Sequence, residues 1–236
     1  MRSCLIQLVL SAVIIFALLW FGLPLGASWL ATNALNAAGF TGTDTSVQVS
    51  ANLPPRILLG HADEIHITST EVGVGDLHAG AVDLTLGDVE LFDRKIGTVD
   101  GTLTGVLVPA PNGDPITIDS ATIDGTGTAA TARLTTSSAE VIQLAESQFE
   151  AQTGVAATVT LAAPAKVTVT VKGKAEPARL VVLDGAIELV PTDPILPPVP
   201  LIAAGAGNPF QFTSIAVGAG TVTLVGTIDV QSLLGL

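Results

Sequence analysis

The sequence predicts an α+β protein in which a curved, mostly antiparallel β-sheet wraps around one long internal helix and is preceded by an N-terminal transmembrane helix. Three observations predict this fold. The chain begins with a long apolar run, apolar residues recur at every second position beyond about residue 45, and one later segment has helical spacing and helix-end signals. With 236 residues, 48% apolar and 13% charged, the chain can bury a large core.

The first element is the apolar run over residues 5–25, and no charged residue occurs between Arg2 and Asp44. At about 1.5 Å per residue, a helix of this length covers about 30 Å, which is enough to cross a bilayer. Arg2 and the terminal amine mark the cytoplasmic side, so the acidic body is expected outside. A cleaved secretory signal ending near Ala27 is the alternative, and it would secrete the same body.

The domain organisation follows from this run. Small and apolar residues prolong the first helix as far as Gly39, which suits a helix end. We therefore predict a membrane anchor over residues 1–39, a short tether over 40–46 and a single extracytoplasmic domain over 47–236.

Strand signals fill most of that domain. Val82, Leu84 and Leu86 alternate with polar residues, and the alternation shifts by one position at Gly87, as a β-bulge would cause. The pair Asp184-Gly185 predicts a tight hairpin, and Gly218-Ala219-Gly220 predicts a second one. β-Branched and Thr-rich runs between turn residues are typical of an antiparallel sheet of roughly ten strands.

One internal helix interrupts the strands. Ser137 followed by Glu140 is a capping-box pattern, and Gly154 suits the C-terminal end. The apolar residues between them recur at helical spacing and form a stripe that is expected to pack on a sheet: Val141, Leu144, Ala145 and Phe149.

Charge and motifs exclude several classes of function. The net charge of −12 repels phosphates, which argues against nucleic-acid binding. The imidazoles are His61, His66 and His78, and on a strand His61 and His66 point to opposite faces, so no metal site is expected. The sequence contains no nucleophile elbow, zinc-protease motif or P-loop. We therefore expect a protein that is not an enzyme and needs no cofactor.

Two features indicate apolar surfaces. Positions opposite the apolar rows often hold Thr, Ala or Gly, a composition that suits a sheet covered on both sides. The connection over residues 191–210 is long and apolar, which suggests a lid, a groove lip or a bilayer contact. Burial over an open end of the sheet is the equal alternative. The candidate lip residues are Ile195, Leu196, Val199, Leu201, Ile202 and Phe210.

The order of these features resembles the LmeA-like phospholipid-binding family of exported bacterial envelope proteins. The resemblance runs from the N-terminal anchor through the Ser137 to Gly154 helix to the last hairpin, and its local patterns are residues 53–60 (LPPRILLG), 82–91 (VDLTLGDVEL) and 178–190 (ARLVVLDGAIELV). It implies an extracytoplasmic protein that binds phospholipid and supports lipoglycan assembly, and a fold similar to the tubular lipid-binding proteins.

Together these expectations describe a membrane-anchored, extracytoplasmic protein that holds phospholipid acyl chains in an apolar groove and serves envelope lipid or lipoglycan maintenance. Its expected partners are a membrane phospholipid and, through the N-terminal helix, the bilayer. The alternative is an envelope structural or interaction domain with a filled core and no ligand.

Overall fold

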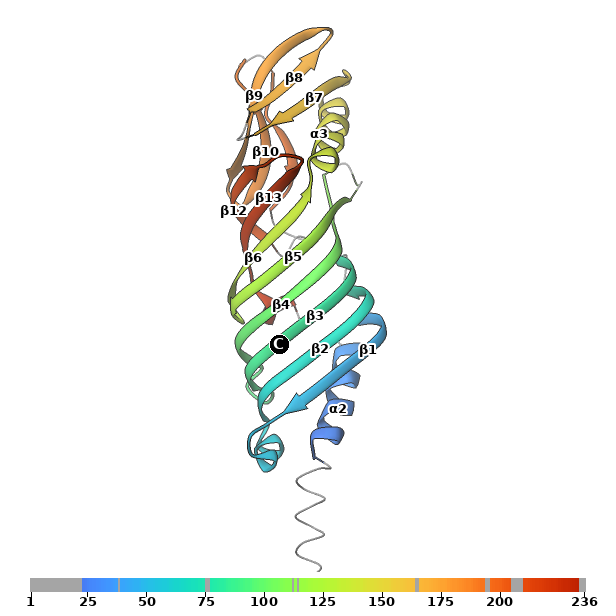
Figure 1. Cartoon of the computed structure of the whole chain (residues 1–236), viewed down its shortest axis with the longest axis vertical. Coiled ribbons are helices and arrows are strands. Elements are labelled where there is room, and N and C mark those ends of the chain that lie inside the picture. Colours follow the sequence, from blue (N-terminus) through green and yellow to red (C-terminus); the bar gives the residue numbers. More distant parts are fainter. Residues whose placement is uncertain are drawn as a thin grey trace, which may run out of the picture.

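The computed structural model describes residues 23–37, 39–74, 77–111, 113, 115–163, 166–193, 196–204 and 210–233. Two antiparallel sheets make up most of the molecule, so the prediction of a mostly antiparallel β protein is confirmed. Figure 1 shows an elongated molecule in which the larger sheet curls along the lower two thirds and the smaller sheet forms the opposite end.

Eight strands form the larger sheet, in the order β1 (Phe40–Ser50), β2 (His61–Val74), β3 (Leu77–Glu90), β4 (Lys95–Val108), β5 (Ile116–Thr126), β6 (Ala129–Ser137), β13 (Thr221–Ile228) and β12 (Phe210–Val217). Five strands form the smaller one, in the order β11 (Val199–Ile202), β10 (Ala186–Pro191), β9 (Lys174–Leu183), β8 (Lys166–Val171) and β7 (Ala157–Ala162). The helices are α2 (Leu23–Ala37), α3 (Ser138–Thr153), α4 (Val230–Leu233) and the 3-10 helix η2 (Pro54–Leu59).

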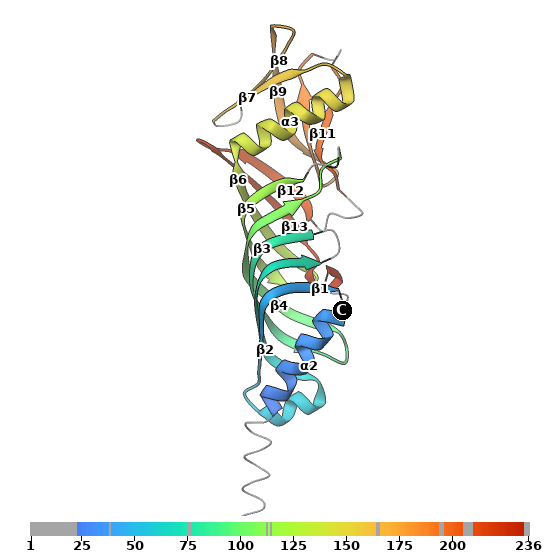
Figure 2. The ribbon, with the colours of Figure 1, turned by 90° about the vertical axis from the view of Figure 1, so that its right-hand side faces the viewer.

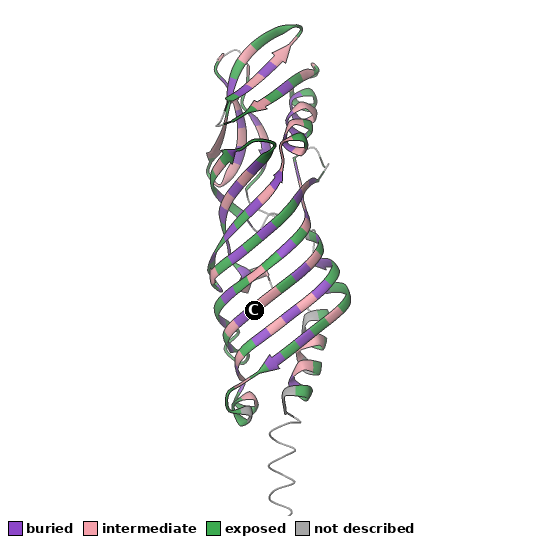
Figure 3. Ribbon diagram, in the orientation of Figure 1, coloured by how far each residue is buried: buried purple, intermediate pink, exposed green. Residues whose placement is uncertain are grey.

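The register of the larger sheet separates an apolar inner face from a polar outer face, and burial alternates along the strands accordingly (Figure 3). One inner row crosses all eight strands without a polar side chain: Val47, Ile67, Leu84, Gly101, Ile123, Ala132, Gly226 and Phe212. The adjoining outer row is polar throughout: Gln48, His66, Thr85, Asp100, Asp124, Thr131, Thr227 and Gln211.

Small residues on the inner face allow neighbouring strands of the curled sheet to approach closely. At Gly101, a Cβ would collide with the backbone oxygen of Asp83, so the strand accepts no side chain at this point of the inner row. On the outer face, Thr102, Thr104 and Thr122 are exposed. These threonines are therefore uncovered, although their composition also suits a sheet covered on both sides, because curling the sheet buries the inner face without a second layer over the outer one.

One predicted irregularity of the strands is present and the other is not. Asp88 adopts the left-handed conformation (φ 50°) where the sequence shifts phase. The pairs Ala62–Val89 and Glu64–Gly87 keep one register, however, so β3 holds no extra residue there and the prediction of a bulge is wrong. Asp184 (φ 49°) and Gly185 (φ 79°) form the two-residue turn between β9 and β10.

Helix α3 begins and ends where the sequence predicts, but it does not lie inside the larger sheet. The Ser137 hydroxyl accepts a hydrogen bond from the Glu140 backbone N–H, and Gly154 ends the helix with φ 71°. The predicted apolar stripe is buried. The large sheet does not wrap around α3, however: the helix crosses its end and packs on β7 and β11 as well as on β5, β6 and β13 (Figure 2). Strands β7 to β11, which follow α3, form a sheet of their own, and the helix covers the junction of both sheets.

The predicted tether is part of a strand. Residues 40–46 belong to β1, because their polar side chains and backbone bind β2: the Thr45 and Ser69 hydroxyls are 2.7 Å apart, and the Ser69 hydroxyl also donates to the Thr43 carbonyl oxygen. Most of the expected membrane span, residues 5–22, lies outside the described residues. Among the helices of the described part, none combines the length and apolarity that a bilayer crossing requires.

Candidate functional site

The candidate lip residues lie in the core. Val199, Leu201, Ile202 and Phe210 are at most 2% exposed, Leu196 is half-buried against the same core, and Ile195 lies outside the described residues. As the structure places them, these side chains form no exposed lip. The alternative drawn from the sequence is burial over an open end of the sheet. The residues are buried, but Val199, Leu201 and Ile202 lie in β11 and Phe210 in β12, which are edge strands of the two sheets.

Burial of this connection has a local cause, since part of it is a strand. Val199 lies opposite Leu189 and Ile202 opposite Ile187, so β11 is the edge of the five-stranded sheet. Helix α3 packs against it, and the Gln152 side-chain amide donates to the Pro198 carbonyl oxygen at 3.2 Å. The prolines of this stretch argue against a strand in the sequence, because proline has no backbone N–H to donate. Edge strands nevertheless tolerate proline.

The inner face of the large sheet is the second surface that could hold an apolar ligand. Its walls are aliphatic, and its side chains touch one another: Val99, Val106 and Ile118 are at most 1% exposed. The sheet is open at β1, where helix α2 lies alongside. Of the α2 side chains that the structure describes, Ala27 and Ala31 pack against the core here, and the Ser28 hydroxyl accepts a hydrogen bond from the Val49 N–H at 3.1 Å.

A third surface lies at the end of the molecule that holds α2 and η2, and we call it the apolar tip. It comprises Leu25 and Trp29 of α2, Leu53, Leu58 and Leu59 in and before η2, and Leu91 and Phe92 of the β3–β4 turn. Of the eight large apolar side chains that are exposed among the described residues, seven belong to it. Figures 1 and 2 show both helical segments at the same end.

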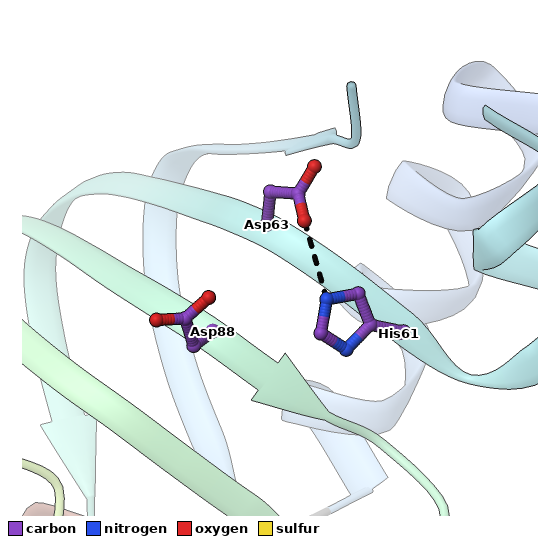
Figure 4. A group of neighbouring side chains, drawn as sticks. All are labelled: His61, Asp63 and Asp88. Atoms are coloured by element: carbon purple, nitrogen blue, oxygen red, sulfur yellow. Dashed lines mark hydrogen bonds and ion pairs between the residues drawn. The ribbon is translucent and has the colours of Figure 1, made fainter. Parts of the chain in front are cut away.

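His61, Asp63 and Asp88 form the nearest approach to a metal site (Figure 4), with ligand atoms within 4.8 Å of one another. The pairing of β2 with β3 brings the Asp88 carboxylate beside His61, and no local sequence pattern predicts that pairing. However, the Asp63 carboxylate is already engaged. Its Oδ1 lies 3.2 Å from both His61 Nε2 and Arg56 Nη1.

The hydrogen bond from the Asn52 backbone N–H lowers the pKa of Asp63 below its usual value, and the Arg56 guanidinium and His61 act in the same direction. A guanidinium beside the same oxygen competes with any cation. The cluster therefore acts as a tie that fastens η2 and the chain before it to strand β2.

The outer face of the sheet carries a shallow depression of about 320 Å³, lined mainly by polar side chains of β2, β3 and β4. Thr68, Asp83 and Thr102 of one outer row lie in it. None of the candidate lip residues contributes to its lining.

Comparison of the chain with protein-family models, with curated proteins and with solved structures finds no match in any of the three. The LmeA-like resemblance therefore stays an expectation that rests on the residues quoted above, and the function is proposed from the geometry.

Proposed function

We propose that this is a membrane-anchored, extracytoplasmic phospholipid-binding protein of the cell envelope, and that acyl chains lie along the inner face of the curled sheet. The apolar row across all eight strands carries the proposal. Aliphatic walls accept an acyl chain without polar partners, and each buried methylene contributes about 0.8 kcal/mol. The outer face is polar, so the inner face is the side of the sheet on which an apolar ligand would lie.

A lipid enters, in this proposal, between α2 and β1. The inner face is packed when α2 lies on the sheet, so an acyl chain needs an edge that separates at low cost. Among the described side chains of α2, the small Ala27 and Ala31 contact the core, and the Ser28 hydroxyl accepts a hydrogen bond from the Val49 N–H. Movement of α2 away from β1 would uncover Val47 and Val49, the first members of the inner rows.

An envelope structural or interaction domain without a ligand is the second candidate. The close packing of the inner face favours it, because Val99, Val106 and Ile118 leave almost no surface for a guest. The two candidates differ in whether the inner face ever contacts lipid.

Photochemical labelling of the full chain in proteoliposomes distinguishes them. A phospholipid with a diazirine at the end of one acyl chain is activated by light, and labelled residues are mapped by mass spectrometry. We expect labels on inner-face residues such as Val47 and Ile67. Labels confined to residues before 26 and to the apolar tip would overturn acyl-chain binding, because a passive membrane neighbour produces the same pattern.

A locked variant serves as the matched control. Ser28→Cys with Val49→Cys, in a Cys4→Ser background, joins α2 to β1 by a disulfide at the point where a hydrogen bond now links them. We expect the oxidised form to lose inner-face labelling and the reduced form to regain it. Equal labelling of both forms would refute entry at this edge.

A further inference from the structure

We propose that the apolar tip inserts into the surface of the bilayer, so that this end of the elongated domain rests on the membrane with the five-stranded sheet pointing away. The inference rests on the membrane-anchored part of the proposed function and is independent of acyl-chain binding to the inner face.

The tip is a built surface, because three segments distant in sequence are fastened together there. The Leu91 N–H donates to the Gly60 carbonyl oxygen at 2.7 Å, which joins the β3–β4 turn to the end of η2. The Phe92 ring lies against Gly60, where any Cβ would collide with the ring. Helix α2 packs on η2, and the Arg56–Asp63 ion pair ties η2 to β2.

The exposed groups are those that favour a membrane interface. The side chain of Phe92 is 76% exposed, that of Leu59 75% and that of Trp29 67%. Each of them can therefore bury its exposed apolar area only against a partner outside the domain. Aromatic rings concentrate where lipid headgroups meet acyl chains, and a contiguous apolar patch on a folded domain marks an interaction site.

Charge argues that apolar burial drives the contact. Arg56, Arg94 and Lys95 lie at this end together with four acidic residues, Asp63, Asp88, Glu90 and Asp93. These charges nearly offset one another, whereas the whole chain carries −12 and is repelled by an anionic membrane. Burial of apolar side chains, and not attraction between opposite charges, therefore has to drive the contact of the tip with lipid.

The path of the chain indicates that the apolar tip contacts a bilayer. The apolar run over residues 5–25 reaches the described domain at Leu23, where α2 begins, and Leu25 of that run is already part of the tip. If the run crosses a bilayer, the tip is the first part of the domain to emerge from it. An apolar surface at that place meets lipid before it can meet any other partner.

Site-directed fluorescence tests the contact on the full chain. In a Cys4→Ser background, single cysteines replace Leu59, Phe92 or, as a control at the far end beside the β8–β9 turn, the exposed Ala175. Each carries a small polarity-sensitive fluorophore in vesicles of phosphatidylcholine and phosphatidylglycerol whose acyl chains are partly brominated. We expect the bromines to quench both tip probes at least about twofold more than the Ala175 probe, and aqueous iodide to quench in the reverse order.

Two outcomes would overturn the proposal. Equal iodide quenching at the tip and at Ala175, without bromine quenching, would place the tip in water. Protection of the tip probes from both quenchers would mean that protein, such as a second copy of this chain, covers them.

A double variant, Leu59→Ser with Phe92→Ser, tests the same contact through a fluorophore on a cysteine that replaces Leu53. Bromine quenching of this fluorophore should fall, while the melting temperature stays unchanged because both replaced side chains are exposed.

Discussion

Truncation of Leu201 tests whether the connection over residues 191–210 is core or lip. The side chain is 1% exposed in β11, between strand β10 and helix α3. Replacement of a buried leucine by alanine costs about 2–5 kcal/mol. In a domain of this size each kcal/mol lowers the melting temperature by about 2–4 °C, so Leu201→Ala should melt roughly 4–20 °C below the parent. A mobile lip would show no such loss.

Far-ultraviolet circular dichroism of the full chain in a mild detergent follows the melting of both sheets. Leu183→Ala is the matched control, because Leu183 is 49% exposed and its truncation removes little burial. The same two samples are extracted for phospholipid. If Leu201→Ala melts with the control and loses lipid instead, the placement of β11 in the core is refuted and the lip interpretation gains its support.

Three further variants test local features. Gly185→Ala should lower the free energy of unfolding by about 1 kcal/mol in urea titrations, because φ is 79° there; an unchanged value would contradict the left-handed turn. Gln148→Met should raise it by about 1–3 kcal/mol, since the buried Gln148 Nε2 has no acceptor within the described part of the chain; a loss would mean that the amide has a partner. Asp63→Asn should be less stable than the parent above about pH 3.8 and equal to it in stronger acid, because the Asn52 N–H lowers the folded pKa of Asp63, and its stabilisation is lost as the pH falls through that lowered value. Thermal melting across pH 2–7 measures this convergence, and a constant difference would refute it.

Much of the local structure could be read from the sequence, because it depends on signals within a few residues. Ser137 and Gly154 bound the internal helix, and Asp184-Gly185 marks the hairpin. These features follow from backbone conformation and capping, which neighbouring residues decide.

Placement in space could not be read in the same way. The stripe on α3 predicts that the helix packs on strands, but it does not say which, and β7 to β11 compete with the larger sheet for that face. Residues 40–46 resemble a tether until the Thr and Ser side chains find partners on β2. The apolar tip could not be predicted, because its residues come from three separate segments that only the fold brings together.

The strand order of the larger sheet has a consequence for folding during synthesis. Each of strands β2 to β6 pairs with the strand before it, so these strands can assemble one after another as the chain emerges. The free edge of β6 stays unpaired until β13 is synthesised, and β13 follows α3 and the entire smaller sheet in the chain. Until Thr221 reaches Ser137, that edge is an unpaired template for other chains. A holding chaperone is therefore most useful to this protein during the interval between β6 and β13.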